Sequence, residues 1–152
     1  MPHVPGFAPF NAALVYAAIP EEALKLAALA MLSPRRALFL AATGVACGFA
    51  AGENVLAAAY AGGSSAMLAA RLLVAWPAHL SLAAVAAEVL TRTGLDIRGY
   101  LLAFLCVMPL HALFDTLFFM GWSQMGTAAV AAAFLIALAI WRYRAASGTI
   151  LR

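Results

Sequence analysis

Long hydrophobic runs fill this chain, and short polar stretches separate one run from the next. An α-helix needs about 20 predominantly apolar residues to cross a lipid bilayer. We therefore predict an all-α membrane bundle of about five transmembrane helices, over residues 7–32, 37–60, 67–90, 100–121 and 125–141. The first segment is expected to be broken near Pro20, either as one kinked helix or as a lead-in followed by a helix that begins at Glu21.

The composition agrees with a membrane protein. Hydrophobic residues make up 66% of the 152 residues and charged residues only 10%, whereas soluble domains are about 45–50% apolar and about 25% charged. The net charge of +3 is spread thinly, which excludes a basic nucleic-acid-binding face. Cys47 and Cys106 lie in separate apolar runs without CxxC spacing and are interpreted as small buried hydrophobes. No repeat or linker divides residues 1–152, so we predict a single domain.

The arginines that lie between or after the segments predict the orientation in the membrane. All of them follow the first, third and fifth segments, and the stretches after the second and fourth segments contain none. Lys and Arg concentrate on the cytoplasmic side of membrane proteins. We therefore expect a cytoplasmic carboxyl terminus and an external amino terminus. The arginines are Arg35, Arg36, Arg92, Arg98, Arg142, Arg144 and Arg152.

Ionisable side chains within apolar runs are the most informative positions, because each costs a few kcal/mol or more in hydrocarbon. A rise of about 1.5 Å per residue places most of them at a similar depth, between the midplane and the outer half of the membrane. Groups at one depth on four helices can face one another, which predicts a buried polar site. The polar and ionisable residues of these runs are Glu21, Glu22, Lys25, Glu53, Asn54, Arg71, His79, Glu88, His111 and Asp115.

Helical spacing pairs several of these residues. His111 and Asp115 are four positions apart and share a helix face, and Lys25 follows Glu21 by four positions and Glu22 by three. Each pair also has a purely structural interpretation, as a helix-packing hydrogen bond or a neutralising ion pair. The spacing alone does not choose between Glu21 and Glu22 as the partner of Lys25.

Three further features have competing interpretations. Arg71 is expected either to extend to the outer interface or to belong to the site, and Glu88 is expected to form a surface pair with Arg92. The GxxxGxxxG stripe over residues 44–52 is typical of close helix packing, which would bring Glu53 near a partner helix.

Histidines and carboxylates at one depth suit general acid–base work on water. Lys25 would keep one carboxylate of the Glu21–Glu22 pair ionised as a base, and a histidine would steady the oxyanion or protonate the leaving amine. A serine nucleophile is poorly supported, because no GxSxG occurs. Two histidines and a glutamate can bind zinc, but HExxH is absent. We expect no cofactor, and metal dependence stays open.

These residues resemble the motifs of the PrsW-type intramembrane proteases, which belong to a wider membrane superfamily with the CAAX prenyl endopeptidases. The resemblance covers about residues 21–115. The matching motifs, in order, are EExxK at Glu21-Glu22 and Lys25, FxxxEN from Phe49 to Glu53-Asn54, Arg71 with His79, and HxxxD at His111 and Asp115.

The resemblance implies a glutamic-type endopeptidase that cleaves a membrane-anchored protein, with an anti-sigma factor cut at an extracytoplasmic site as the family's substrate class. A small proton- or ion-coupled transporter and an inactive helix-binding scaffold are the alternatives. The implied catalytic residues are Glu21 or Glu22 as base, together with Glu53, His79, His111 and Asp115; Lys25, Asn54 and Arg71 are implied as supporting residues.

Overall fold

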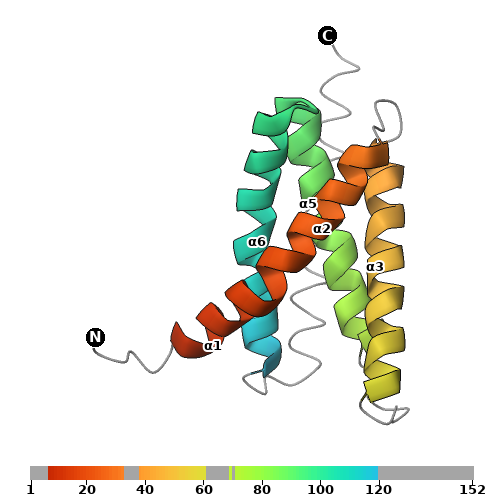
Figure 1. The fold of residues 1–152 in the computed structure, drawn as a ribbon, viewed down its shortest axis with the longest axis vertical. Coiled ribbons are helices and arrows are strands. Elements are labelled where there is room, and N and C mark those ends of the chain that lie inside the picture. Colours follow the sequence, from red (N-terminus) through yellow and green to blue (C-terminus); the bar gives the residue numbers. More distant parts are fainter. Residues whose placement is uncertain (1–6, 33–37, 61–68, 70, 120–152) are drawn as a thin grey trace, which may run out of the picture.

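The computed structural model describes residues 7–32, 38–60, 69 and 71–119. Every regular element in these ranges is a helix, which confirms the predicted all-α class (Figure 1). In chain order the elements are α1 (Phe7–Ala13), the π-helical segment η1 (Leu14–Ala18), α2 (Ile19–Leu32), α3 (Leu38–Tyr60), the π-helical segment η2 (Arg71–Ala75), α5 (Trp76–Thr93) and α6 (Ile97–Phe119).

Three helices within the described ranges are long and apolar enough to cross a membrane: Leu38–Ala59, Arg71–Thr93 and Ile97–Leu117. They correspond to the second, third and fourth predicted segments. The first predicted segment is also helical, but α2 is only 14 residues long and carries three charged side chains. The fifth predicted segment, residues 125–141, lies outside the described residues. The single domain predicted over 1–152 includes that segment and therefore stays a prediction.

The irregularity expected near Pro20 takes the form of a change in hydrogen bonding. The backbone stays helical through α1, η1 and α2, but the N–H of Ile19 bonds to the carbonyl of Leu14, five positions earlier. Proline has no N–H to give to the carbonyl four positions before it. The second π-helical segment, η2, stands in the same relation to a proline, because Pro77 lies two residues after η2 ends. Both helices therefore adapt to proline without ending.

The helix α5 lies at the centre of the bundle and packs against both α3 and α6. The continuous α1–η1–α2 helix crosses these three at a steep tilt, so that α1 contacts α6 while α2 reaches α3 (Figure 1). Leu26 and Leu29 of α2 pack with Leu82 and Leu90 of α5 and Val107 of α6 in an apolar core. This core occupies the half of the bundle near the α5–α6 turn and leaves the other half for polar side chains.

A tight turn joins α5 to α6. Gly94 has a positive φ of 102°, which side chains disfavour, and its N–H bonds to the carbonyl of Leu90 at 2.9 Å to close the end of α5. Asp96 then accepts a hydrogen bond from the N–H of Gly99 at 2.8 Å and caps the start of α6. This turn makes α5 and α6 antiparallel neighbours.

The interpretation of the glycine stripe as a packing surface is wrong for the described part of the chain. Gly44, Gly48 and Gly52 are exposed, and a Cβ at any of them would meet nothing within 4 Å. The neighbouring stripe of small residues is buried instead, with Ala46 fully buried and Ala42 and Ala50 nearly so. The two stripes are offset by two residues, about 200° around a helix, so they face nearly opposite directions.

Candidate active site

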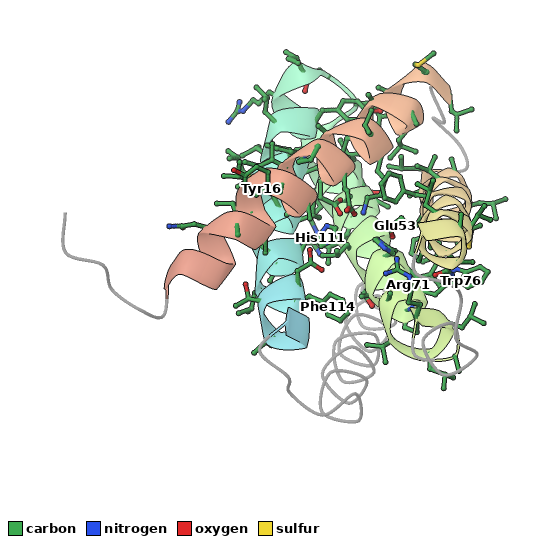
Figure 2. The ribbon with its side chains drawn as sticks, turned by 60° about the horizontal axis from the view of Figure 1, so that its bottom comes forward. Tyr16, Glu53, Arg71, Trp76, His111 and Phe114 are labelled. Atoms are coloured by element: carbon green, nitrogen blue, oxygen red, sulfur yellow. The ribbon has the colours of Figure 1, made fainter. Side chains whose placement is uncertain are left out.

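The structure brings together all nine residues predicted for the site. They come from five elements: Glu21, Glu22 and Lys25 from α2, Glu53 and Asn54 from α3, Arg71 from η2, His79 from α5, and His111 and Asp115 from α6. In Figure 2 the labelled His111, Glu53 and Arg71 lie in the space between these helices. Glu88 is not among them, because it lies near the other end of α5, where it pairs with Arg92 at 2.8 Å. The expected pair is present, but Glu88 is buried and does not lie on the surface.

Proline precedes the three most buried acidic and imidazole groups of this site. In hydrocarbon, a proline in a helix is tolerated where other groups or a water-lined cavity satisfy the freed carbonyl. We therefore expect carbonyl groups freed by proline at the level of the site, where polar side chains are present. Each of the three lies two positions after a proline: Glu22 after Pro20, His79 after Pro77, and His111 after Pro109.

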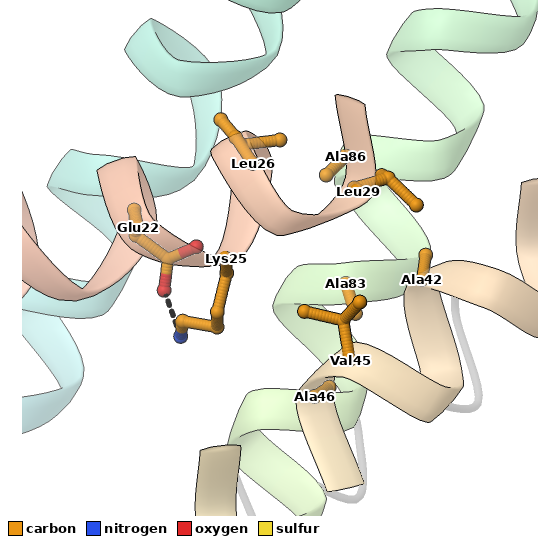
Figure 3. Close-up of a pocket in the computed structure, with 9 residues that line it drawn as sticks. All are labelled: Glu22, Lys25, Leu26, Leu29, Ala42, Val45, Ala46, Ala83 and Ala86. Atoms are coloured by element: carbon orange, nitrogen blue, oxygen red, sulfur yellow. Dashed lines mark hydrogen bonds and ion pairs between the residues drawn. The ribbon is translucent and has the colours of Figure 1, made fainter. Parts of the chain in front are cut away.

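Glu22 and Lys25 form the buried centre of the site. Their side chains make an ion pair with only 3% and 7% exposure, respectively (Figure 3). The Lys25 ammonium also lies 3.1 Å from His79 Nδ1 and 5.0 Å from the centre of the Phe49 ring. The structure thus selects Glu22 as the hydrogen-bonded partner of Lys25, a choice that the sequence left open.

The partners of each histidine define where its protons lie. The Lys25 ammonium is only a donor, so His79 Nδ1 accepts and His79 Nε2 carries the proton that it donates to Glu53 Oε2 at 2.7 Å. His111 donates from Nδ1 to Glu22 Oε1 at 2.7 Å. The two imidazole rings meet edge to face, 5.5 Å between centroids. Carboxylates therefore hold both rings in defined orientations, as second partners do for ligating or catalytic histidines.

The other ring nitrogen of His111 faces two further carboxylates. Glu21 Oε2 and Asp115 Oδ2 each lie 3.5 Å from His111 Nε2. Glu21 Oε2 is buried, yet within the described residues it has no hydrogen-bond donor. A bare imidazole lone pair facing two carboxylates is unfavourable. This position is therefore suited to a proton, a water molecule or a metal ion.

These groups surround a cavity of about 180 Å³, large enough for several water molecules or a peptide group. Its polar wall combines three carboxylates, two imidazoles and one guanidinium. Sequence reasoning did not identify its apolar wall, because small side chains at helical spacing look the same on a lipid-facing surface. The apolar wall comprises Ala17, Ala75, Ala78, Leu82 and Phe114.

A second, smaller cavity of about 20 Å³ lies beyond Glu22 and Lys25, toward the apolar core (Figure 3). This volume suffices for about one water molecule. Apart from the ion pair, its walls are apolar side chains of α2, α3 and α5, among them Leu29, Val45 and Ala86. Lys25 therefore stands between the two cavities, with its charge satisfied by Glu22 and His79.

Among the described residues, Glu21, His79 and His111 could together hold a metal ion. Each offers one ligand atom, and these atoms lie within 4.8 Å of one another. Imidazole nitrogens and a carboxylate oxygen suit zinc, and the buried Glu21 Oε2 without a donor is a further reason to expect a cation there. The residues present therefore fit a metal centre as well as a carboxylate that acts directly on water.

A bundle of membrane-crossing helices around a buried cavity of carboxylates and histidines suits hydrolysis within the membrane. Comparison with known protein families gives the same class: the model of the PrsW family of intramembrane metalloproteases matches residues 2–142. This chain belongs to that family, and it is therefore an intramembrane peptidase whose substrates are membrane-anchored proteins. Among curated proteins and solved structures, none matches the chain.

Proposed function

We propose that this peptidase activates water through Glu21. The observation that carries the proposal is the buried Glu21 Oε2, which has no donor among the described residues and lies in the cavity wall with His79 and His111. A buried carboxylate oxygen that lacks a donor has a strong affinity for a proton or a cation. Glu22 differs, because Lys25 and His111 already bond to it. Its role in the proposal is to orient those two side chains.

In the proposed reaction, a water oxygen bonds to the carbonyl carbon of the scissile peptide while Glu21 takes a proton from the water. The carbonyl π pair moves onto its oxygen and forms an oxyanion. In this reaction His111 begins as the imidazolium, with one proton on Nδ1 toward Glu22 and one on Nε2 between Glu21 and Asp115. When the intermediate collapses, the C–N bond breaks and the leaving nitrogen takes the Nε2 proton of His111. Glu21 then returns a proton to His111, whose Nε2 lies 3.5 Å from Glu21 Oε2.

The family description as a metalloprotease adds a second form of the proposal. Glu21, His79 and His111 would hold the ion, because they are the described residues whose donor atoms converge. When bound, such an ion acidifies water and polarises a carbonyl group. For His79 to ligate, one of its hydrogen bonds, to Lys25 or to Glu53, must be exchanged. Both forms require Glu21, His79 and His111.

We further propose that cleavage takes place at the extracytoplasmic side, as for an anti-sigma factor. His111 lies eight residues before the end of α6 at Phe119, about 12 Å along the helix axis. Arg92 and Arg98 lie at the opposite end of the bundle, beside the α5–α6 turn. If the arginine-rich end is cytoplasmic, the cavity lies in the outer half of the membrane. The carboxyl terminus is then cytoplasmic if residues 125–141 form the expected fifth span.

The test measures cleavage of a single-span reporter in cells that express wild type, Glu21→Gln or Glu22→Gln at matched levels. We expect both variants to lose cleavage, but for different reasons. Glu21→Gln should leave the thermal stability of the purified protein unchanged or higher, since Glu21 Oε2 accepts no hydrogen bond from the described residues. Glu22→Gln should lower it. Glu88→Gln, remote from the cavity, is the matched control. Full cleavage by Glu21→Gln would contradict the proposal.

A further inference from the structure

Arg71 is the one lysine or arginine among the residues that line the 180 Å³ cavity. It begins η2, the π-helical segment before Pro77, and its side chain is 25% exposed. Lys25, the other basic side chain of the described site, pairs with Glu22 and His79 and lines the smaller cavity instead. Figure 2 shows Arg71 beside Glu53, within the ring of helices. Arg71 therefore belongs to the cavity wall, and of the two sequence interpretations the site location holds.

One bond orients the Arg71 side chain and leaves its far end available. Nε donates to Asn54 Oδ1 at 2.9 Å, while Nη2 lies 3.6 Å from Glu53 Oε2, an ion pair longer than a hydrogen bond. To the described residues the guanidinium makes no hydrogen bond from Nη1 or Nη2. Four of its five N–H donors thus remain for a ligand in the cavity, in a fork suited to an anionic oxygen.

The acidic side chains around the cavity make a positively charged hydrogen-bond donor necessary for peptide hydrolysis there. Glu21, Glu53 and Asp115 are three acidic side chains in its wall. Peptide hydrolysis places a negative charge on the carbonyl oxygen when water adds to the carbon, and nearby carboxylates oppose that charge. Catalytic sites meet this problem with donors that are already oriented toward the oxyanion. The Arg71 guanidinium supplies charged donors of this kind in the same wall.

We propose that Arg71 is a catalytic residue that binds the oxyanion of the tetrahedral intermediate through its Nη donors. Asn54 is the positioning residue that holds the guanidinium by Nε. This inference rests on the proposed function, because it presupposes that water attacks a peptide bond inside the cavity. In this proposal the two polar residues of the FxxxEN segment have separate roles, because Glu53 orients His79 and Asn54 orients Arg71.

The test compares two probes that bind the purified full chain in lipid nanodiscs. One is a capped tetra-alanine peptide; the other is its phosphinic analogue, in which a tetrahedral, negatively charged phosphinate replaces the central amide. We expect wild type to prefer the phosphinate, and Arg71→Met to reduce that preference by roughly a hundredfold, the scale seen when one oxyanion donor is removed. Arg71→Lys should recover part of it, and Arg98→Met, exposed at the other end of the bundle, should change nothing.

Three results would overturn the proposal: no preference for the phosphinate in wild type, an unchanged preference in Arg71→Met, or an equal loss of affinity for both probes. The third would show that Arg71 only supports the structure. The reporter assay separates this inference from the proposed function. If Glu21→Gln loses cleavage and Arg71→Met keeps it, only the role of Arg71 fails; if both keep it, the proposed function fails as well.

Discussion

Removal of the buried ammonium of Lys25 should destabilise the fold strongly. Lys25→Met keeps most of the side-chain volume but leaves Glu22, whose side chain is 3% exposed, without its cation. Two opposite charges in contact attract by roughly 4–5 kcal/mol at an effective dielectric constant of about 20. Breaking a buried pair by removing one partner typically costs about 3–5 kcal/mol. His111 still donates to Glu22 Oε1 at 2.7 Å, so we expect the lower end, a loss of about 3 kcal/mol.

A double-mutant cycle tests whether that cost belongs to the pair. Glu22→Gln alone should also destabilise, because Lys25 then becomes the uncompensated charge. The double variant should lose about 2 kcal/mol less than the sum of the single losses, since neither charge remains. Unfolding of the purified protein in mixed micelles of mild detergent and dodecyl sulfate, followed by tryptophan fluorescence, measures the free energies.

Arg98→Met, at an exposed position, is the control for charge removal in general. Strictly additive losses would refute the reasoning, because they would mean that the two buried charges do not depend on each other. Single losses below about 1 kcal/mol, the scale of solvent-exposed pairs, would refute it too. In that case the pair would have to be solvated in the folded protein.

Two further predictions concern the small residues of α3 and the metal. Gly48→Ala should stabilise the helix by up to about 1 kcal/mol, because a Cβ meets open space there, whereas Ala46→Leu, at a fully buried position, should destabilise by about 1–3 kcal/mol in the same unfolding assay. Elemental analysis of the purified protein tests for the metal. About one ion per chain in wild type, with a clear loss in Glu21→Gln and His111→Gln, supports the metal form. If the protein holds no metal and still cleaves in the presence of chelators, the carboxylate acts directly on water.

Much of the fold and the grouping of the polar residues could be predicted from the sequence, because both follow from simple periodicities. Continuous apolar runs define the crossing helices, and depth along each run places charged residues at one level. The i,i+4 spacing also explains why His111 and Asp115 approach each other, at 3.5 Å. The catalytic roles of these residues stay predictions.

The direction in which each side chain points could not be predicted in the same way. Glu21 and Glu22 differ by about 100° around one helix. Only the packing of α2 against α3 and α6 turns the face with Glu22 and Lys25 inward and leaves Glu21 at the cavity. The two small-residue stripes of α3 pose the same problem, since Ala and Gly both permit close packing. The hydrogen bond from Arg71 to Asn54 joins residues 17 positions apart on different helices. The spacing of residues along a single helix cannot predict such a contact.

The distribution of the site over the chain has a consequence for biogenesis. Acidic and basic groups of the cavity enter the membrane one helix at a time, and His111 and Asp115, on α6, follow all the others in chain order. A partly synthesised chain that ends before α6 contains Glu21, Glu53 and His79 but lacks the imidazole that stands between Glu21 and Asp115. Helices insert first and associate afterwards. Under the proposed mechanism such a chain lacks its proton donor, so cleavage would begin only after α6 has docked.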